Sequence, residues 1–481
     1  MIGVQYLRPT SLAEVHACLQ KHPQAQLLAG GQSLLAAMRL GLAHPSHLVD
    51  LQDVPELQDV RVTDDGVWIG AMATHARIAA HPEIQQHHPM LAKLAHGIAD
   101  QQVRNVGTIG GSLVNNDPAA CWPAGVLAYG ATLFTSQREI PADQFFTDLF
   151  TTALQAGEVL LGVLWPACAS AQYVKYEQPA SRFAMVGVAV TRTTRHDNSP
   201  VRVAITGLGN GVTRWPEAEA ALQAHWSVQA LNGVHLSAEL AHTDVHASAS
   251  YRAHLSAVLC RRAVAAHTGE DTHLPRTTHG TRSPHARTTG TVAPGLSIHG
   301  SHELTQAVPL VWDALLDPVV LQQCIPGCES IQRLSDTLYT AVVKVGLGPV
   351  SARFETQIRV MPVRTPSQGD PAVCHLHLSG QAGSLGQGEA EVVVQLRAHA
   401  TGTSPDAQGT HLQWQATPKV SGQLAQLGNR LMQASARSLS TQFFERLARV
   451  LSGQDASPAK FGFFSAVAEF FRHWHQLIFR K

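Results

Sequence analysis

The pattern of apolar and polar positions first sets apart a region of mixed structure, from Met1 to about residue 267. Short apolar runs at residues 26–28 and 201–205 alternate there with stretches of helical spacing at residues 11–19 and 248–266. Helical spacing predicts amphipathic helices, and short apolar runs between turn residues predict buried strands. The region is therefore expected to combine helices and strands in an α+β fold.

The character of the chain then changes. Residues 268–292 are rich in Thr, His, Arg, Gly and Pro, a composition typical of a flexible linker. Within residues 293–452, strands with alternating apolar positions, such as 352–360, precede a long helix predicted at 422–451. Residues 460–481 form a separate segment behind the polar sequence SGQDASP.

Composition narrows the class of protein. The chain has 481 residues, of which 44% are hydrophobic and 15% charged, so several folded domains are expected and a disordered chain is excluded. The formal net charge is zero, which does not favour nucleic acid as a partner. Seven cysteines without a CxxC pair, and no secretory signal, indicate a reducing, cytoplasmic compartment. No apolar run is long enough to predict a spanning helix.

Two glycine loops carry the candidate chemistry. The first directly follows an apolar run and consists of Ala29, Gly30, Gly31, Gln32 and Ser33. The second consists of Gly107, Thr108, Ile109, Gly110, Gly111 and Ser112. Paired glycines allow close approach and positive φ, and successive backbone N–H groups can hold a pyrophosphate. Neither loop matches GxGxxG or a P-loop, and either one alone is explained equally well as a simple turn.

Together with their flanking residues, the loops resemble a known family. AGGQSLLAAMRL and VRNVGTIGGSLVNNDPAACWPA are similar to the PCMH-type FAD-binding fold shared by vanillyl-alcohol oxidase and the molybdenum hydroxylases. The closer resemblance is to the medium, flavin-carrying subunit of the carbon monoxide dehydrogenase and xanthine dehydrogenase family. It continues through GEVLLGVLWP and VKYEQPASRFAMVGVAV. It implies an FAD-binding domain at residues 1–170 and a medium-subunit α/β subdomain at 171–267.

The resemblance implies roles for individual residues. Both glycine loops would wrap the FAD pyrophosphate, and Asn116 and Asp117 would reach the ribose or adenine side. Leu160 would pack near the flavin or the adenine. Lys175 would lie near the flavin ring, where a cation stabilises a reduced, anionic flavin, and Phe183 would stand beside the isoalloxazine.

One position departs from the family pattern. Cys121 stands where many relatives have an acidic residue, so one polar contact to the cofactor is lost; a small buried residue is the favoured interpretation.

The chain lacks the Cys-x4-Cys-x2-Cys spacing of a plant-type 2Fe–2S site. The resemblance therefore implies that a small 2Fe–2S subunit and a large molybdopterin subunit are partners. Electrons would pass from the cluster through FAD to an acceptor, which requires no catalytic acid or base on this chain. Relatives of the large subunit oxidise carbon monoxide, aldehydes, purines and other N-heterocycles, and the substrate stays open.

The third region resembles the G subunit of carbon monoxide dehydrogenase, a member of the START-like (SRPBCC, helix-grip) superfamily. The resemblance rests on PLVWDALLDPVVLQQCIPGCESI, LSGQAGSLGQGEAEVVVQL and the closing helix. It implies a curved antiparallel sheet around a long helix, with an apolar cavity that could hold a quinone. A collapsed cavity and a pure docking module are the alternatives. Cys324 and Cys328 flank a Pro-Gly turn and make only a weak metal pair.

Residues 460–481 are amphipathic. One helical stripe contains Phe463, Val467, Phe470, Phe471, Trp474, Leu477 and Ile478, and basic residues lie beside it. This pattern is typical of a helix in the membrane interface, which would place the protein at the inner face of the membrane. The alternative is a helix packed on the protein itself or on a partner.

Two other functions stay open at this point. A self-contained flavin oxidase would share the FAD-binding fold, although no covalent-flavin motif or substrate domain is evident. A maturation or membrane-anchoring factor would have kept the flavin fold without redox activity.

Overall fold

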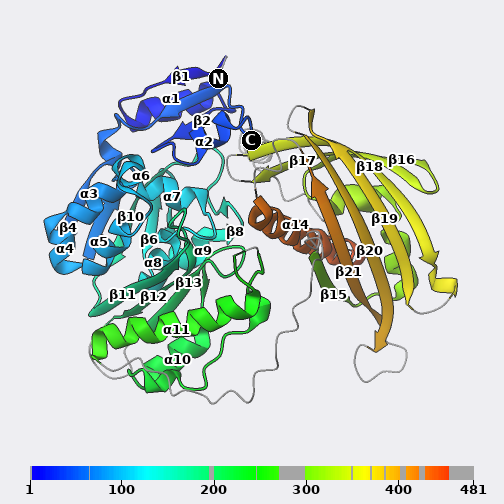
Figure 1. Ribbon diagram of the computed structural model, residues 1–481. Coiled ribbons are helices and arrows are strands. Elements are labelled where there is room, and N and C mark those ends of the chain that lie inside the picture. Colours follow the sequence, from blue (N-terminus) through cyan, green and yellow to red (C-terminus); the bar gives the residue numbers. More distant parts are fainter. Residues whose placement is uncertain are drawn as a thin grey trace, which may run out of the picture. The chain divides into compact units, whose positions relative to one another are not determined.

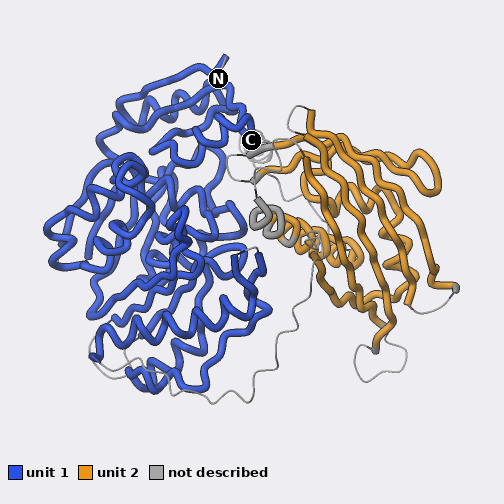
Figure 2. The backbone as a smooth tube through the Cα atoms, viewed as in Figure 1, with its two compact units in different colours: residues 1–284 blue, residues 285–481 orange. Residues whose placement is uncertain are grey.

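The computed structural model describes ten stretches of the chain, residues 3–63, 66–193, 200–244, 246–269, 298–347, 350–368, 371–383, 386–400, 408–421 and 428–453. The chain divides into two compact units, residues 1–284 and 285–481 (Figure 2). Most of the predicted linker at 268–292 and the whole predicted helix at 460–481 lie outside the described residues.

Unit 1 begins with a small parallel sheet. Strands β1 (Gln5–Leu7), β3 (His47–Asp50) and β2 (Gln26–Leu28) lie in that order, beside helices α1 (Leu12–Lys21) and α2 (Leu34–Arg39). The hydroxyl of Ser11 caps α1 by accepting the N–H of Glu14. Parallel strands need a crossover connection, and α2 provides it between β2 and β3. The chain leaves β2 through the first glycine loop and then enters α2.

A second, antiparallel sheet forms the centre of the FAD-type domain. Its order is β4 (Val60–Thr63), β5 (Gly66–Gly70), β10 (Leu160–Pro166), β6 (Thr132–Thr135) and β7 (Glu139–Pro141). The helices are α3 (His75–Ala80), α4 (Pro82–His87), α5 (Pro89–His96), α6 (Gln101–Val106), α7 (Ile109–Asn115), α8 (Trp122–Tyr129) and α9 (Ala142–Phe145), followed by the hairpin β8 (Phe146–Asp148) and β9 (Thr151–Thr152).

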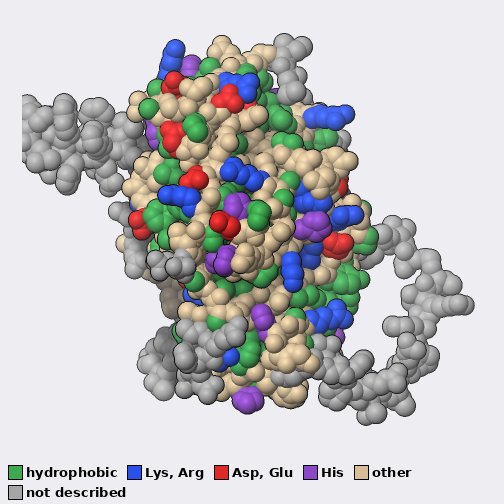
Figure 3. Space-filling view, turned by 90° about the vertical axis from the view of Figure 1, so that its left-hand side faces the viewer, with side chains coloured by type: hydrophobic (Ala, Val, Ile, Leu, Met, Phe, Trp, Pro, Cys, Tyr) green, Lys and Arg blue, Asp and Glu red, His purple; other side chains and the backbone are tan. Residues whose placement is uncertain are grey.

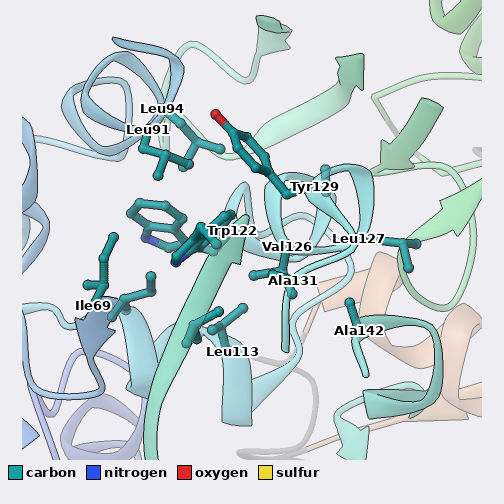
Figure 4. Close-up of a cluster of buried hydrophobic side chains, with 14 of the residues drawn as sticks. Ile69, Leu91, Leu94, Leu113, Trp122, Val126, Leu127, Tyr129, Ala131 and Ala142 are labelled. Atoms are coloured by element: carbon teal, nitrogen blue, oxygen red, sulfur yellow. The ribbon is translucent and has the colours of Figure 1, made fainter. Parts of the chain in front are cut away.

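Helix α8 lies at the centre of this core. All of its residues are buried, as expected of a helix that is apolar on every side. Around it, Trp122 and Tyr129 pack with Leu91, Leu94 and Leu113 from neighbouring helices (Figure 4). The aromatic rings of Trp122 and Trp165 lie 5.7 Å apart between centroids, so helix and sheet are joined by large, rigid side chains.

A third, antiparallel sheet completes unit 1. It contains β11 (Ser170–Glu177), β12 (Ala184–Arg192), β13 (Val201–Thr206) and β14 (Thr213–Arg214), and α10 (Pro216–Ala224) and α11 (Ala249–Thr268) cover it (Figure 1). The guanidinium of Arg252 on α11 pairs with Asp244 at 2.7 Å, and both side chains are buried. Arg252 also donates to the carbonyl of Gly207, which fastens α11 to the sheet.

An ion-pair network joins the second and third sheets. Both carboxylate oxygens of Asp143 on α9 accept hydrogen bonds from Arg202 on β13, at 2.7 Å. Arg202 donates as well to the carbonyl of Leu127 on α8, at 2.9 Å. Charged contacts of this kind fix direction as well as distance, so the two subdomains meet in one defined orientation.

Unit 2 is one antiparallel sheet with three α-helices and one short 3-10 helix (Pro366–Gln368) among its described residues. The strands lie in the order β15 (Ile298–Leu304), β21 (Gln408–Val420), β20 (Gln387–Ala400), β19 (Ala372–Gln381), β18 (Val350–Arg364), β17 (Leu338–Leu347) and β16 (Cys328–Ser335). Helices α12 (Val308–Ala314) and α13 (Pro318–Cys324) follow the first strand, and α14 (Gly428–Leu451) lies along the sheet (Figure 1). None of the described helices combines the length and apolar character that crossing a bilayer requires.

The core of unit 2 forms where the helices meet the sheet. Leu396 on β20, Leu412 on β21 and Leu447 on α14 are fully buried there. Cys324 ends α13 and Cys328 begins β16, with Gly327 at φ +75° in the turn between them, as the sequence favoured.

On the face of the molecule in Figure 3, acidic, basic and histidine side chains are interspersed with apolar ones.

The Arg252–Asp244 pair yields a stability prediction. Asp244→Asn leaves the buried guanidinium without its counter-charge, so unfolding of unit 1 should require about 3 kcal/mol less free energy. Urea denaturation followed by tryptophan fluorescence measures this loss. The matched control is Asp59→Asn, since the Asp59–Arg61 pair is exposed and should contribute less than about 1 kcal/mol. Equal effects of the two substitutions would contradict the assignment.

Candidate FAD-binding site

The two predicted glycine loops lie in contact. A Cβ atom on Gly30 would overlap the backbone carbonyl of Val106 and lie 2.7 Å from the Cα of Gly107. A Cβ on Gly111 would lie 3.6 Å from the Cβ of Ala29. Glycine at position 30 is therefore required for the first loop to reach the second.

Four backbone N–H groups of the second loop, those of residues 109–112, donate to acceptors within the protein. Ile109 and Gly110 donate to the carbonyls of Ala73 and Ala71, at 3.1 and 2.8 Å. The N–H of Gly111 donates to the hydroxyl of Thr108, which caps α7. Ser112 donates to the carbonyl of Thr108. The amides of Ile109 and Gly110 thus anchor the loop to the segment that follows β5, and those of Gly111 and Ser112 bond within the loop. The predicted contact of this loop with the FAD pyrophosphate stays a prediction.

The first loop is the better anion cradle. Among the described residues, no hydrogen bond acceptor is present for the backbone N–H groups of Gly30, Gly31, Gln32 or Ser33. Gly31 adopts φ +68°, the left-handed conformation that turns successive N–H groups toward one side. The loop is partly exposed, with Gln32 and Ser33 at the surface. These free amides fit the diphosphate of FAD.

A buried histidine supports the second loop. The N–H of His75 donates to the carbonyl of Gly107 at 2.9 Å, and a Cβ on Gly107 would lie 3.1 Å from the His75 ring. Trp122 Nε1 donates to Nδ1 of His75 at 3.1 Å, which requires a neutral ring. Burial lowers the pKa of His75 to about 4. The sequence did not single out this residue, because one of 27 dispersed histidines has no local signal.

Asn116 and Asp117 follow the second loop. Asn116 ends α7 at φ 44°, is 1% exposed, and its Nδ2 donates to the carbonyls of Asp148 and Thr151 at 2.8 and 2.9 Å. It therefore holds the β8–β9 turn, a role that the sequence did not reveal. Asp117 is half-buried and accepts the N–H of Ala119 at 2.8 Å. The contacts predicted for both residues with FAD stay predictions.

Leu160 and Cys121 lie in the core that carries the loops. Leu160, at the start of β10, is 4% exposed and belongs to the same cluster as Trp122 and Trp165. Cys121 is buried next to the hydroxyl of Tyr173, as expected for a small core residue, and burial raises the pKa of its thiol.

Lys175 and Phe183 lie at the β11–β12 hairpin. The ammonium of Lys175 donates to the carbonyls of Gly97 and Arg182, at 2.6 and 2.7 Å, and pairs with Glu177 at 3.5 Å. Phe183 is 45% exposed. The predicted placement of both residues beside a flavin ring stays a prediction, but the ammonium of Lys175 is already engaged by backbone carbonyls.

The paired loops on this mixed fold define a class, the FAD-binding oxidoreductase subunits. Residues 2–168 match the family model of the FAD binding domain in molybdopterin dehydrogenase, and residues 171–267 match the CO dehydrogenase flavoprotein C-terminal domain. Residues 300–452 match the family model of CoxG, the G subunit of carbon monoxide dehydrogenase. The chain belongs to the family of the FAD-binding medium subunits of molybdenum hydroxylases, and a CoxG domain follows the medium-subunit part in the sequence.

Individual relatives agree with this family. The nicotine 6-hydroxylase medium subunit of Paenarthrobacter nicotinovorans is 33% identical, over 54% of this chain and 96% of that protein. The carbon monoxide dehydrogenase medium chain of Hydrogenophaga pseudoflava is 37% identical, over 42% of this chain and 74% of that one. The solved carbon monoxide dehydrogenase of H. pseudoflava aligns with a TM-score of 0.50 at 32% identity, covering 56% of this chain and 99% of that chain.

The contact at Ala71 yields a binding prediction. A Cβ on Gly110 would lie 2.6 Å from the Cβ and carbonyl oxygen of Ala71, so Gly110→Val should displace the second loop and weaken FAD binding at least about tenfold. Absorbance of the purified chain after gel filtration with FAD measures the bound flavin. Gly211→Val is the control, since a Cβ there meets nothing within 4 Å. Stoichiometric flavin in Gly110→Val would refute the assignment.

The buried His75 yields a pH prediction. Its pKa is lower in the folded than in the unfolded protein, so its contribution to stability is complete above pH 6.5 and lost as the pH falls toward 4. The loss should reach about 3 kcal/mol. His75→Asn keeps an acceptor for Trp122 but cannot titrate, and should remove this part of the pH dependence. Urea unfolding at several pH values measures this loss, and His87→Asn, at an exposed position, is the control. If the free energy of unfolding depends on pH in the same way in the wild type and in His75→Asn, the prediction is wrong.

Proposed function

We propose that this chain is the FAD-carrying electron-transfer subunit of a molybdenum hydroxylase. It receives electrons from the 2Fe–2S cluster of a small partner subunit, within a complex whose large subunit holds the molybdopterin, and passes them to an acceptor at the membrane. One observation carries the proposal: the free amides of the first glycine loop lie against the second loop in a domain that matches the FAD-binding family model.

The residues of the site bind and orient the cofactor. The N–H groups of Gly30 to Ser33 would hold the diphosphate, and Ser33 and Ser112 would contribute hydroxyl groups. His75 and Trp122 keep the second loop in place without carrying charge. When bound, FAD supplies the electron chemistry that links an iron–sulfur cluster to an external acceptor. No group of this chain needs to move a proton in that step.

The CoxG domain would bring this electron path to a membrane or an apolar acceptor such as a quinone. The described sheet and the long helix α14 support the predicted helix-grip fold. Ile358, paired with Leu378, and Val392, paired with Leu376, continue the apolar face of the core. At one end of that face Val360 and Leu396 are buried, whereas Leu378 and Val392 are only half-buried. A face of this kind suits an apolar ligand.

Purification tests the redox proposal. An absorbance spectrum of the chain isolated from its native host should show bound flavin, and iron–sulfur and molybdenum subunits should co-purify with it. Protein-bound flavin with those partners supports electron transfer, and the partners identify the substrate. A colourless chain that travels alone with membranes would instead indicate the anchoring or maturation function. Turnover of a substrate by the isolated chain would indicate a flavin oxidase.

Liposome binding tests the membrane part of the proposal. Deletion of residues 460–481 should release the full-length protein from vesicles that contain anionic lipid, because the amphipathic segment supplies both apolar and basic groups. A matched variant replaces Phe470, Phe471 and Trp474 by serine and keeps every charge. Co-sedimentation should fall in both variants. Binding that equals the wild type in both would show that the segment is not the anchor.

A further inference from the structure

Two strained residues meet beside the β11–β12 hairpin. Ala99 and Arg182 adopt the left-handed conformation, at φ 42° and 57°, although neither is glycine. Nη1 of Arg182 donates to the carbonyl of Ala99 at 3.3 Å, so each strained residue contacts the other. Strain of this kind persists only where surrounding contacts enforce it, and it is concentrated at functional sites.

Cations enforce this geometry. In the loop of residues 97–99, the carbonyl of Gly97 accepts from Lys175 at 2.6 Å, and the carbonyls of Ile98 and Ala99 accept from Arg104 at 2.9 and 2.7 Å. Every carbonyl of the loop thus receives a cationic donor. Lys175 also donates to the carbonyl of Arg182, which ties the hairpin turn to the loop.

The cluster keeps most of its positive charge. Among the described residues, the carboxylate that pairs with these three cations is Glu177, 3.5 Å from Lys175 and 49% exposed. The remaining partners are neutral, namely backbone carbonyls and the side-chain oxygen of Gln101. Neutral acceptors satisfy hydrogen bonds without cancelling charge, so the cluster is a source of positive potential.

The chain connects the cluster to both parts of the proposed cofactor site. The loop of residues 97–99 leads into α6, which ends at Gly107 of the second glycine loop. On the other side, Arg182 directly precedes the exposed ring of Phe183. A displacement of Arg182 is therefore expected to shift both the second glycine loop and the ring of Phe183.

We propose that Arg182 is a positioning residue of the flavin site. With Lys175 and Arg104 it fastens the turn that carries Phe183 to the loop that leads into the second glycine loop, and holds positive charge where an electron-rich flavin ring would lie. The inference rests on the proposed function. It assigns to Lys175 a share in this tether in addition to the charge that the family resemblance led us to expect of it.

The test compares Arg182→Gly, Arg182→Ala and Arg182→Lys in the full chain. Glycine removes the guanidinium and accepts the left-handed turn without strain, alanine removes the guanidinium and keeps the strain, and lysine keeps the charge. Arg262→Ala is the control, since Arg262 is exposed on α11. Hydrogen exchange of residues 97–107 and 178–184 reports the tether. Flavin titration and the midpoint potential of the bound flavin report the site.

In Arg182→Gly, exchange should rise about tenfold in both segments, since a hydrogen bond to a charged group is lost. The FAD Kd should rise about fivefold, and the midpoint potential should become more negative, because less positive charge stabilises the reduced flavin. Arg182→Lys should restore the potential in part. A purely structural role would lower the melting temperature and leave the potential of the bound flavin at the wild-type value, which would overturn the inference.

Failure of the proposed function is a separate result. If the wild-type chain takes up no FAD, the electron-transfer proposal fails, while hydrogen exchange still decides whether Arg182 couples the two segments. If the wild type binds FAD and Arg182→Gly changes neither exchange nor potential, the function stands and the positioning role is wrong.

Discussion

The contact of backbone with backbone between the two glycine loops is the constraint on which the N-terminal unit depends. At Gly30 even a methyl group would overlap the carbonyl of Val106, and at Gly110 it would meet Ala71. The loop after strand β2 of the small parallel sheet can therefore approach the central domain this closely only because positions 30 and 110 are glycine. The approach leaves the amides of residues 30–33 in the first loop without partners among the described residues, while Ile109 and Gly110 of the second loop donate to Ala73 and Ala71.

Such an approach is useful only if the second loop is rigid. The neutral ring of His75, between Trp122 and Gly107, supplies that rigidity from inside the core, where a charged group would cost more than it stabilises. Asp143 and Arg202 then fix the medium-subunit subdomain against the same core. The chain thus presents the hairpin with Phe183 on a subdomain whose orientation is set by directional charged contacts.

The second unit is built on a different principle. Its long strands alternate between apolar and polar positions, and along the apolar face Val360 and Leu396 are buried whereas Leu378 and Val392 are half-buried. These half-buried apolar side chains are the observation behind the proposal that the domain takes an apolar ligand.

The sequence by itself determined the families, both glycine loops and the succession of a mixed region and a strand-rich one, because these depend on local spacing and on short motifs. It also predicted the turn between Cys324 and Cys328, which the structure contains. Which amides lack partners, the inward turn of Asn116 to the β8–β9 turn, and the contacts of His75 with Trp122 and of Arg104 and Arg182 with Ala99 are set by the tertiary structure alone. Those facts depend on contacts between segments far apart in the chain, and hydrogen-bond partners across such distances leave no pattern in the order of the residues.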